Sequence, residues 1–200
     1  MKKLLTTLTV IGTLLMTSTA NATDLENTLY LELKDGRVVI ELLPEKAPNH
    51  VKRIKELARE KFYDGIVFHR VIEGFMAQTG DPDGNGTGGS GQKIKAEFND
   101  VSHTRGVASM ARSASPDSGD SQWFIVFDDA TFLDKQYTAW GKVIEGMEYV
   151  DRIKKGDSAR NGEVSDPDKM ITLSVAADVE AKLAKPKKTA NPAKAAAAAQ

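Results

Sequence analysis

Arg70 is the first residue of this chain whose type and position suggest chemistry. It lies in the apolar run 66–72, IVFHRVI, where a guanidinium is costly to bury without partners, so we expect it at the edge of a cleft. Ten of the 13 aromatic residues fall within residues 62–75 and 123–140. These aromatic residues indicate either a hydrophobic core or an apolar site that presents Arg70 to a ligand.

The glycine-rich segment 80–89 allows two further interpretations, as a phosphate loop or as a calcium loop. It lacks the Gly-Lys-Ser/Thr ending of a phosphate-binding loop, and no clear helix pattern follows it. Asp81 and the residues after it match positions 1, 3, 5 and 6 of a calcium loop, but Gln92 stands at position 12, where a bidentate carboxylate is needed. We predict a surface loop beside a site and keep calcium binding as an alternative.

The three histidines, His50, His69 and His103, share no metal-ligand spacing, and the chain contains no cysteine. We predict His50 on a helix surface, and His69 either as a hydrogen-bonded core residue or as an orienting group. A Ser-His-Asp hydrolase is not indicated, because the Gly-x-Ser-x-Gly motif of a nucleophile elbow is absent. Asp128 and Asp129 are adjacent, so in a strand they point to opposite faces and form no carboxylate pair. No metal site and no cofactor is predicted.

The elements that must position these residues are mostly short strands. Alternating apolar residues at 29–33 and 38–42, joined by a turn containing Asp-Gly, predict a hairpin. Apolar residues at helical spacing predict a helix from residue 48 to about residue 62, and a shorter one over 147–153 that ends before Gly156. The remaining strands are expected at 66–72, 76–79, 106–110, 122–127, 138–143 and 170–175. This pattern predicts a closed or sandwiched antiparallel sheet, and in an eight-stranded barrel a site would lie on the outer wall.

Composition excludes several classes of protein. The 200 residues carry 27 lysines and arginines against 28 aspartates and glutamates, so no basic excess supports nucleic-acid binding. With 40% hydrophobic and 28% charged residues, the chain resembles an ordinary soluble domain. The absence of cysteine excludes disulfides and thiol catalysis. No feature indicates an oligomer, so we expect a monomer.

The two ends of the chain differ from the domain between them. Residues 1–22 read as a signal peptide, with Lys2 and Lys3, an apolar stretch at 4–16 and the cleavage motif Ala-Asn-Ala that ends at Ala22. The apolar stretch would reach only about 20 Å as a helix, short of the ~30 Å of a bilayer core, so no membrane insertion is expected after cleavage. We predict export to the bacterial periplasm, a folded domain over 27–177 and a disordered tail rich in Ala, Lys and Pro over 178–200.

Three blocks of sequence resemble the cyclophilin family of peptidyl-prolyl cis-trans isomerases. The first is residues 68–81, FHRVIEGFMAQTGD; the second combines 106–113, GVASMARS, with 121–125, SQWFI; the third combines 132–134, FLD, with 140–143, WGKV. Their order and spacing match the family, which is more specific than any single motif. The resemblance implies a mainly β fold, a closed eight-stranded antiparallel β-barrel capped by two α-helices.

The resemblance also implies roles for eleven residues. Arg70, Phe75 and Gln78 would form the catalytic group. The proline pocket and the peptide groove would be lined by Met76, Ala111, Arg112, Gln122, Phe124, Phe132, Leu133 and Tyr137. Phe132 and Tyr137 stand where the best-known eukaryotic members have tryptophan and histidine. Since the family's tryptophan supports cyclosporin binding through its indole N–H, we expect weak cyclosporin binding and retained isomerase activity. Arg112 replaces a common asparagine.

The implied reaction is rotation about an X–Pro bond in unfolded or partly folded polypeptides. The rotation transfers no group, so it needs no nucleophile, metal or cofactor. Twisting the amide localises the lone pair on the prolyl nitrogen, to which Arg70 can donate a hydrogen bond. Two other classes stay open: a binding module that holds proline segments without useful catalysis, and a calcium-dependent structural protein. Arg70 together with Phe75 and Gln78 favours the enzyme, because a binding module has no need of the arginine.

Overall fold

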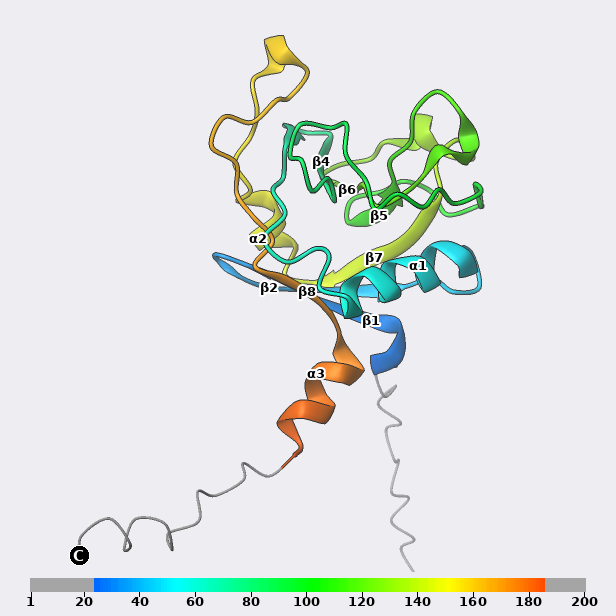
Figure 1. Cartoon of the computed structure of the whole chain (residues 1–200). Coiled ribbons are helices and arrows are strands. Elements are labelled where there is room, and N and C mark those ends of the chain that lie inside the picture. Colours follow the sequence, from blue (N-terminus) through cyan, green and yellow to red (C-terminus); the bar gives the residue numbers. More distant parts are fainter. Residues whose placement is uncertain (1–23, 186–200) are drawn as a thin grey trace, which may run out of the picture.

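The computed structural model describes residues 24–185, so the predicted signal peptide and the tail from residue 186 lie outside the described residues. Eight strands form one antiparallel sheet in the order β3-β4-β6-β5-β7-β2-β1-β8, which curves into a half-barrel (Figure 1). This confirms the predicted mainly β, eight-stranded antiparallel fold. The strands are β1 Thr28–Leu33, β2 Gly36–Leu42, β3 Arg70–Ile72, β4 Met76–Thr79, β5 Val107–Met110, β6 Trp123–Val126, β7 Ala139–Glu145 and β8 Thr172–Val175.

The prediction of a closed barrel is wrong in one respect, because no ladder joins the edge strands β3 and β8. Just before β3, the chain meets the 168–170 segment through the bonds Phe68 N–Asp168 O and Met170 N–Ile66 O, both 2.9 Å long. These bonds explain why β3 begins at Arg70 and not at the predicted residue 66. The free edge of β3 is covered by the 156–162 segment, since Val71 N donates to Gly162 O over 2.8 Å.

Helix α1, Pro48–Arg59, packs Val51, Ile54 and Leu57 into the core. Ala47 at its N-cap has no side chain to accept the free amides of the first turn. Glu97, from a distant loop, accepts the N–H groups of Asn49 and His50 instead, each at 3.0 Å.

The predicted surface position of His50 is wrong. Its side chain is 1% exposed, and its Nδ1 lies 2.6 Å from Glu97 Oε2. His50 precedes Ile54 by four residues and Leu57 by seven, so it lies on the buried face of α1 with them, and Glu97 supplies the polar partner of its ring.

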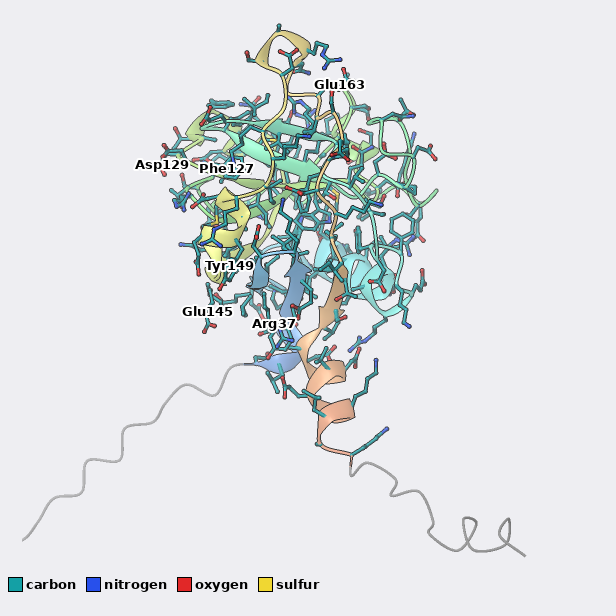
Figure 2. The ribbon with its side chains drawn as sticks, turned by 90° about the vertical axis from the view of Figure 1, so that its left-hand side faces the viewer. Arg37, Phe127, Asp129, Glu145, Tyr149 and Glu163 are labelled. Carbon is teal, nitrogen blue, oxygen red and sulfur yellow. The ribbon has the colours of Figure 1, made fainter. Side chains whose placement is uncertain are left out.

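Two further helices pack on the sheet, where sequence patterns predicted only one. Helix α2, Met147–Asp151, lies against the start of β2, where Gly36 leaves room for the ring of Tyr149 (Figure 2). A Cβ at Gly36 would lie 2.5 Å from the Cζ of Tyr149.

Helix α3, Ala176–Leu183, was not predicted. It covers the first residues of the segment predicted to be disordered, and Asp178 pairs with Arg59 Nε at 2.9 Å. No helix of residues 24–185 is both long and apolar enough to cross a membrane.

Alternation along the strands divides the apolar side chains into two clusters. The larger cluster, called here the enclosed core, contains Trp123 and Ile125 of β6 together with the buried face of α1. The smaller cluster, on the opposite face of the sheet, contains Phe124 and Val126 of β6 with Met76 of β4. The candidate site lies over this second cluster.

Candidate active site

Strand pairing brings Arg70, Gln78 and Phe124 into one row across three strands. Arg70 of β3 lies opposite Gln78 of β4, and Gln78 lies opposite Phe124 of β6. Directly opposite residues of an antiparallel sheet point to the same face, so the arginine, the amide and the aromatic ring share one surface.

The guanidinium of Arg70 is held on two sides. Its Nη1 donates to Gln78 Oε1 at 3.1 Å, while its Nε and Nη2 donate to the backbone oxygen and Oδ1 of Asn161 at 3.0 and 2.9 Å. Burial lowers the pKa of Arg70 below its usual value. Among the described residues no carboxylate pairs with it. The geometry therefore fixes a half-buried cation whose charge is left for a ligand.

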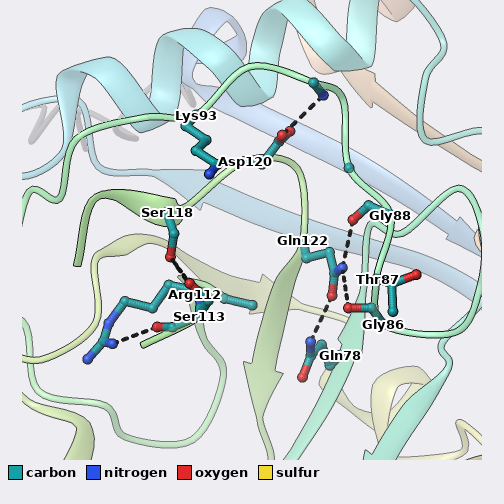
Figure 3. A pocket seen from close by; sticks show the side chains of 13 residues that line it. Gln78, Gly86, Thr87, Gly88, Lys93, Arg112, Ser113, Ser118, Asp120 and Gln122 are labelled. Atoms are coloured by element: carbon teal, nitrogen blue, oxygen red, sulfur yellow. Dashed lines mark hydrogen bonds between the residues drawn. The ribbon is translucent and has the colours of Figure 1, made fainter. Parts of the chain in front are cut away.

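Gln78 is oriented in turn by Gln122. The Nε2 of Gln78 donates to Gln122 Oε1 at 2.9 Å, and the Nε2 of Gln122 donates to the carbonyl oxygens of Gly86 and Gly88 at 3.1 and 2.8 Å (Figure 3). Because each amide donates away from Arg70, the oxygen of Gln78 must face the guanidinium. The glycine-rich loop thereby contributes to the orientation of Arg70 through two side-chain amides.

An apolar cavity of about 240 Å³ lies beside Arg70 and brings together ten of the eleven predicted site residues. They are Arg70, Phe75, Met76, Gln78, Ala111, Arg112, Phe124, Phe132, Leu133 and Tyr137. We call this space the apolar cavity. The eleventh residue, Gln122, contacts Gln78 and lines the neighbouring cavity instead.

The walls of the apolar cavity are aromatic pairs. Phe75 and Phe132 have ring centroids 5.4 Å apart, and the edge-to-face pair of Phe124 and Tyr137 has centroids 5.8 Å apart. Phe132 is 64% exposed and forms the rim, whereas Phe124 and Leu133 are buried. The cavity is therefore lined mainly by apolar groups, with the guanidinium groups of Arg70 and Arg112 and the amide of Gln78 at its edge, which suits a small apolar ring next to a polar bond.

Arg112 stands between the apolar cavity and a neighbouring cavity of about 410 Å³. Its guanidinium lies 4.5 Å from the centroid of the Tyr137 ring, and its Nε donates to Gln136 O at 3.0 Å. The neighbouring cavity, shown in Figure 3, also shares Gln78 and Ala111 with the apolar cavity, so an extended chain could cross both.

The shape of the glycine-rich loop is held by the side chain of Asp81. Asp81 is buried, and its carboxylate accepts the backbone N–H groups of Asp83, Asn85 and Gly86. These bonds lower the pKa of Asp81 against the effect of burial. The carboxylate expected at position 1 of a calcium loop is thus used to shape the loop. Gly80 begins it at φ +83°, where a Cβ would lie 2.2 Å from Ser121 O.

His69 is buried without the hydrogen bonds that were expected of a core histidine. Neither of its ring nitrogens has a partner among residues 24–185. Burial lowers the pKa of His69, with Asp81 opposing this shift. The ring lines a cavity of about 560 Å³ on the other side of Arg70.

Two features of the site have no local signal in the sequence. Asn161 holds Arg70 although it lies 91 residues away in a turn between α2 and β8. Ser109, His103 and Asp134 form a hydrogen-bonded chain, with His103 Nε2 3.0 Å from Ser109 Oγ and His103 Nδ1 2.9 Å from Asp134 Oδ1. These are the residue types of a hydrolase triad, but Ser109 is fully buried in a strand, where its hydroxyl cannot reach a substrate.

Comparisons with known proteins identify the family of this chain. A model of the family described as cyclophilin type peptidyl-prolyl cis-trans isomerase/CLD matches residues 28–175. A probable peptidyl-prolyl cis-trans isomerase of Brucella suis is 52% identical over 174 residues, which cover 81% of this chain and 89% of that protein.

Two solved cyclophilins share the fold. Cyclophilin AquaCyp293 from Hirschia baltica aligns with a TM-score of 0.69 and 29% identity, over 78% of this chain and 76% of that one. A cyclophilin-type isomerase of Cryptosporidium parvum, solved in the presence of the dipeptide Ala-Pro, aligns with a TM-score of 0.68 and 26% identity, over 74% and 98%.

Fold and site together define a half-barrel isomerase whose cavity and arginine face outward. The chain belongs to the cyclophilin-type peptidyl-prolyl cis-trans isomerase family, as its three motifs predicted. It is a peptidyl-prolyl cis-trans isomerase.

Proposed function

We propose that this isomerase acts on X–Pro bonds of exported proteins and that Arg70 is the group that acts on the rotating bond. The observation that carries the role of Arg70 is its placement: a half-buried guanidinium without an ion pair among the described residues, held by Gln78 and Asn161 at the edge of the apolar cavity. The proposed mechanism has no covalent intermediate and no cofactor.

The chemistry follows from the electronic structure of the amide. Rotation about a peptide bond has a barrier of about 18–20 kcal/mol, because the nitrogen lone pair is delocalised in the planar form. A twisted bond has this lone pair localised on the prolyl nitrogen, where a hydrogen-bond donor stabilises it. A cavity that excludes water also removes solvent that stabilises the dipolar planar form. Both effects favour the transition state over the ground state.

Arg70 has a donor left for this purpose. Of the five N–H groups of a guanidinium, three donate to Gln78 and Asn161, and a fourth faces the weak acceptor Met76 Sδ at 3.9 Å. One N–H of Nη2 has no acceptor among residues 24–185. We assign this group to the prolyl nitrogen.

Arg70 alone does not account for an efficient isomerase. A charge-assisted hydrogen bond contributes about 1.5–3 kcal/mol, whereas a 10⁵-fold acceleration requires about 7 kcal/mol. We assign the remainder to the apolar cavity, which would hold the proline ring through Phe75, Met76, Phe124 and Leu133, and to Gln78, which would hold the substrate carbonyl. Fixing one side of the bond while the other rotates lowers the entropic part of the barrier.

The test is cis–trans exchange of an Ala-Pro peptide, measured by NMR for the wild type and for Arg70→Ala. Arg37→Ala is the matched control, since Arg37 lies on β2, three strands away from β6 in the sheet (Figure 2). We expect fast exchange with the wild type and the control, and at least a tenfold loss with Arg70→Ala. Peptide binding without faster exchange in the wild type would identify a binding module instead.

The substrates and surroundings are proposals as well. Proline-containing unfolded or partly folded polypeptides are the proposed clients, which agrees with the Ala-Pro dipeptide named for the Cryptosporidium parvum relative. Weak cyclosporin binding is proposed because Phe132 lacks an indole N–H. Sedimentation would test the proposed monomer, and a mobility-shift assay the expected lack of nucleic-acid binding.

Export to the periplasm rests on the apolar stretch at 4–16 and on the cleavage motif ending at Ala22. Cell fractionation followed by N-terminal sequencing tests it. We expect a periplasmic protein that begins at Thr23 and is absent from the membrane fraction. A cytoplasmic chain that retains residues 1–22 would contradict the proposal.

A further inference from the structure

A buried histidine that does not itself line the apolar cavity connects two of the segments that form its walls. His103 has 0% exposure and lies outside the cavity lining. Its Nδ1 is 2.9 Å from Asp134 Oδ1, and its Nε2 is 3.0 Å from Ser109 Oγ. The imidazole therefore spans the distance between the turn that contains Asp134 and the strand β5 that contains Ser109.

Both ends of this connection adjoin residues that line the cavity. Asp134 directly follows Leu133, at the end of the 3-10 turn Thr131–Leu133. Ser109 lies directly opposite Phe124 in the register of β5 and β6. The His103 ring is also stacked on Phe124, at an interplanar angle of 23° with centroids 6.5 Å apart. A movement of His103 would therefore be transmitted to both walls.

Additional hydrogen bonds join the turn that contains Asp134 to the segment that contains Ser102 and His103. His103 N and Ser102 Oγ each donate to the Asp134 carboxylate at 2.7 Å, and Ala130 N donates to His103 O at 2.8 Å. These donors lower the pKa of Asp134, so its carboxylate is charged at neutral pH. An ionised Asp134 requires a hydrogen on His103 Nδ1, which in the neutral ring leaves Nε2 to accept the Ser109 O–H.

We propose that the Ser109–His103–Asp134 chain positions the turn bearing Phe132 and Leu133 against Phe124, and so sets the width of the apolar cavity. His103 is in this view a positioning residue, because it touches no substrate. The proposal rests on the proposed role of the apolar cavity as the proline site. No bond is made or broken in the chain.

The expected consequence is a change in KM more than in kcat. The cavity holds the proline ring in the planar and the twisted forms alike, so a wider cavity loses binding that the two states share. Arg70 is held by Gln78 and Asn161, independently of His103, and its action on the twisted bond would persist. Loss of the chain should raise KM, whereas loss of Arg70 should lower kcat.

Three substitutions of His103 separate the two arms of the chain. His103→Phe keeps a ring on Phe124 and removes both hydrogen bonds. In His103→Asn the amide nitrogen takes the place of Nδ1 and retains the bond to Asp134; in His103→Gln the amide takes the place of Nε2 and retains the bond to Ser109. We expect KM for a proline peptide to rise at least tenfold in His103→Phe, and by less in the other two.

His50→Phe is the matched control. His50 is equally buried and also bonded to a carboxylate, Glu97, but lies in α1 and lines no part of the cavity. We expect this variant to have a lower Tm and an unchanged KM. If His103→Phe and His50→Phe have equal KM values under conditions where both are folded, the chain is only structural and the proposal is wrong.

A second pair of variants keeps the proposal testable if His103→Phe does not fold. Ser109→Ala and Asp134→Asn each weaken one arm, and we expect higher KM values together with shifted NMR signals of the Leu133 methyl groups. Wild-type KM and unshifted methyl signals in both would overturn it. If the wild type itself does not isomerise the peptide, the proposed function fails, and the Kd of an Ala-Pro peptide in the same variants then decides on the positioning role.

Discussion

The two faces of strand β6 are equally apolar in sequence and differ completely in what they do. Trp123 and Ile125 point into the enclosed core, where α1 and the strands around it leave them no exposure. Phe124 and Val126 point to the other face, where Val126 has no exposure either, but the ring of Phe124 lines the apolar cavity.

The site is therefore defined by packing that leaves a cavity, and not by residue type. On the enclosed face, every apolar group finds a protein partner, and burial serves stability alone. On the open face, the same kind of groups leaves a cavity of about 240 Å³ beside a held cation. Mutations on the two faces should therefore separate stability from activity.

The largest expected effect contrasts the neighbours Ile125 and Phe124. Ile125→Ala should lower the free energy of unfolding by about 2–5 kcal/mol, because it leaves a void in the enclosed core. The kcat/KM of the folded fraction should stay at the wild-type value. Phe124→Ala should instead lower kcat/KM strongly. Urea denaturation and the isomerase assay on both variants test the contrast, which breaks down if folded Ile125→Ala is as inactive as Phe124→Ala.

Arg70→Lys tests how much the guanidinium at the edge of the apolar cavity contributes to catalysis. Lysine keeps the positive charge but loses the planar fork that bonds Gln78 and Asn161 together. We expect the transition state to lose about 1.5–3 kcal/mol, a tenfold to 150-fold fall in kcat. The free energy of unfolding should change by less than about 1 kcal/mol. Wild-type turnover in this variant would remove Arg70 from the mechanism.

The pH dependence of stability distinguishes the buried His50 from the residues of the site. Burial lowers the pKa of His50 below 6.5, although Glu97 opposes the shift. Below pH 6.5 the unfolded chain therefore binds a proton that the folded chain does not, so stability falls as the pH falls through this range. His50 can contribute a slope of up to about 1.4 kcal/mol per pH unit.

His69 has a pKa shifted in the same direction and adds to this slope, whereas the lowered pKa of Glu97 adds a loss only below pH 4.5. Chemical denaturation between pH 5 and 7.5 should give a shallower slope for His50→Phe than for the wild type. The kcat/KM of the folded protein should stay nearly flat, because Arg70 does not titrate there. Equal slopes would show that His50 is protonated equally in both states.

The smallest expected change is in cyclosporin binding and concerns Phe132 at the rim of the apolar cavity. Phe132→Trp adds an indole N–H to an exposed side chain, so stability should change little. One new hydrogen bond of about 0.5–1.5 kcal/mol would tighten cyclosporin binding about 2- to 13-fold. Fluorescence titration measures it, and Phe132→Tyr, which has no indole, is the control. A nanomolar inhibition constant for the wild type would already contradict the proposed weak binding.

Local patterns in the sequence predicted the elements that carry the site. Alternation over 29–33 and 38–42 predicted the hairpin of β1 and β2, and the run 76–79 coincides with β4. Period-two alternation is a local property, so it is readable without knowing which strands are neighbours. The family motifs named ten residues that the structure gathers around one cavity.

The sequence alone was therefore sufficient to predict the strands and the residues along the open face. How the sheet ends, the bond between His50 and Glu97, the bonds from Arg70 to Asn161 and the place of His103 next to the cavity are known only from the folded structure. Each of these depends on a contact between segments distant in sequence. Such contacts follow from the packing of the half-barrel, and no periodicity within a single segment encodes them.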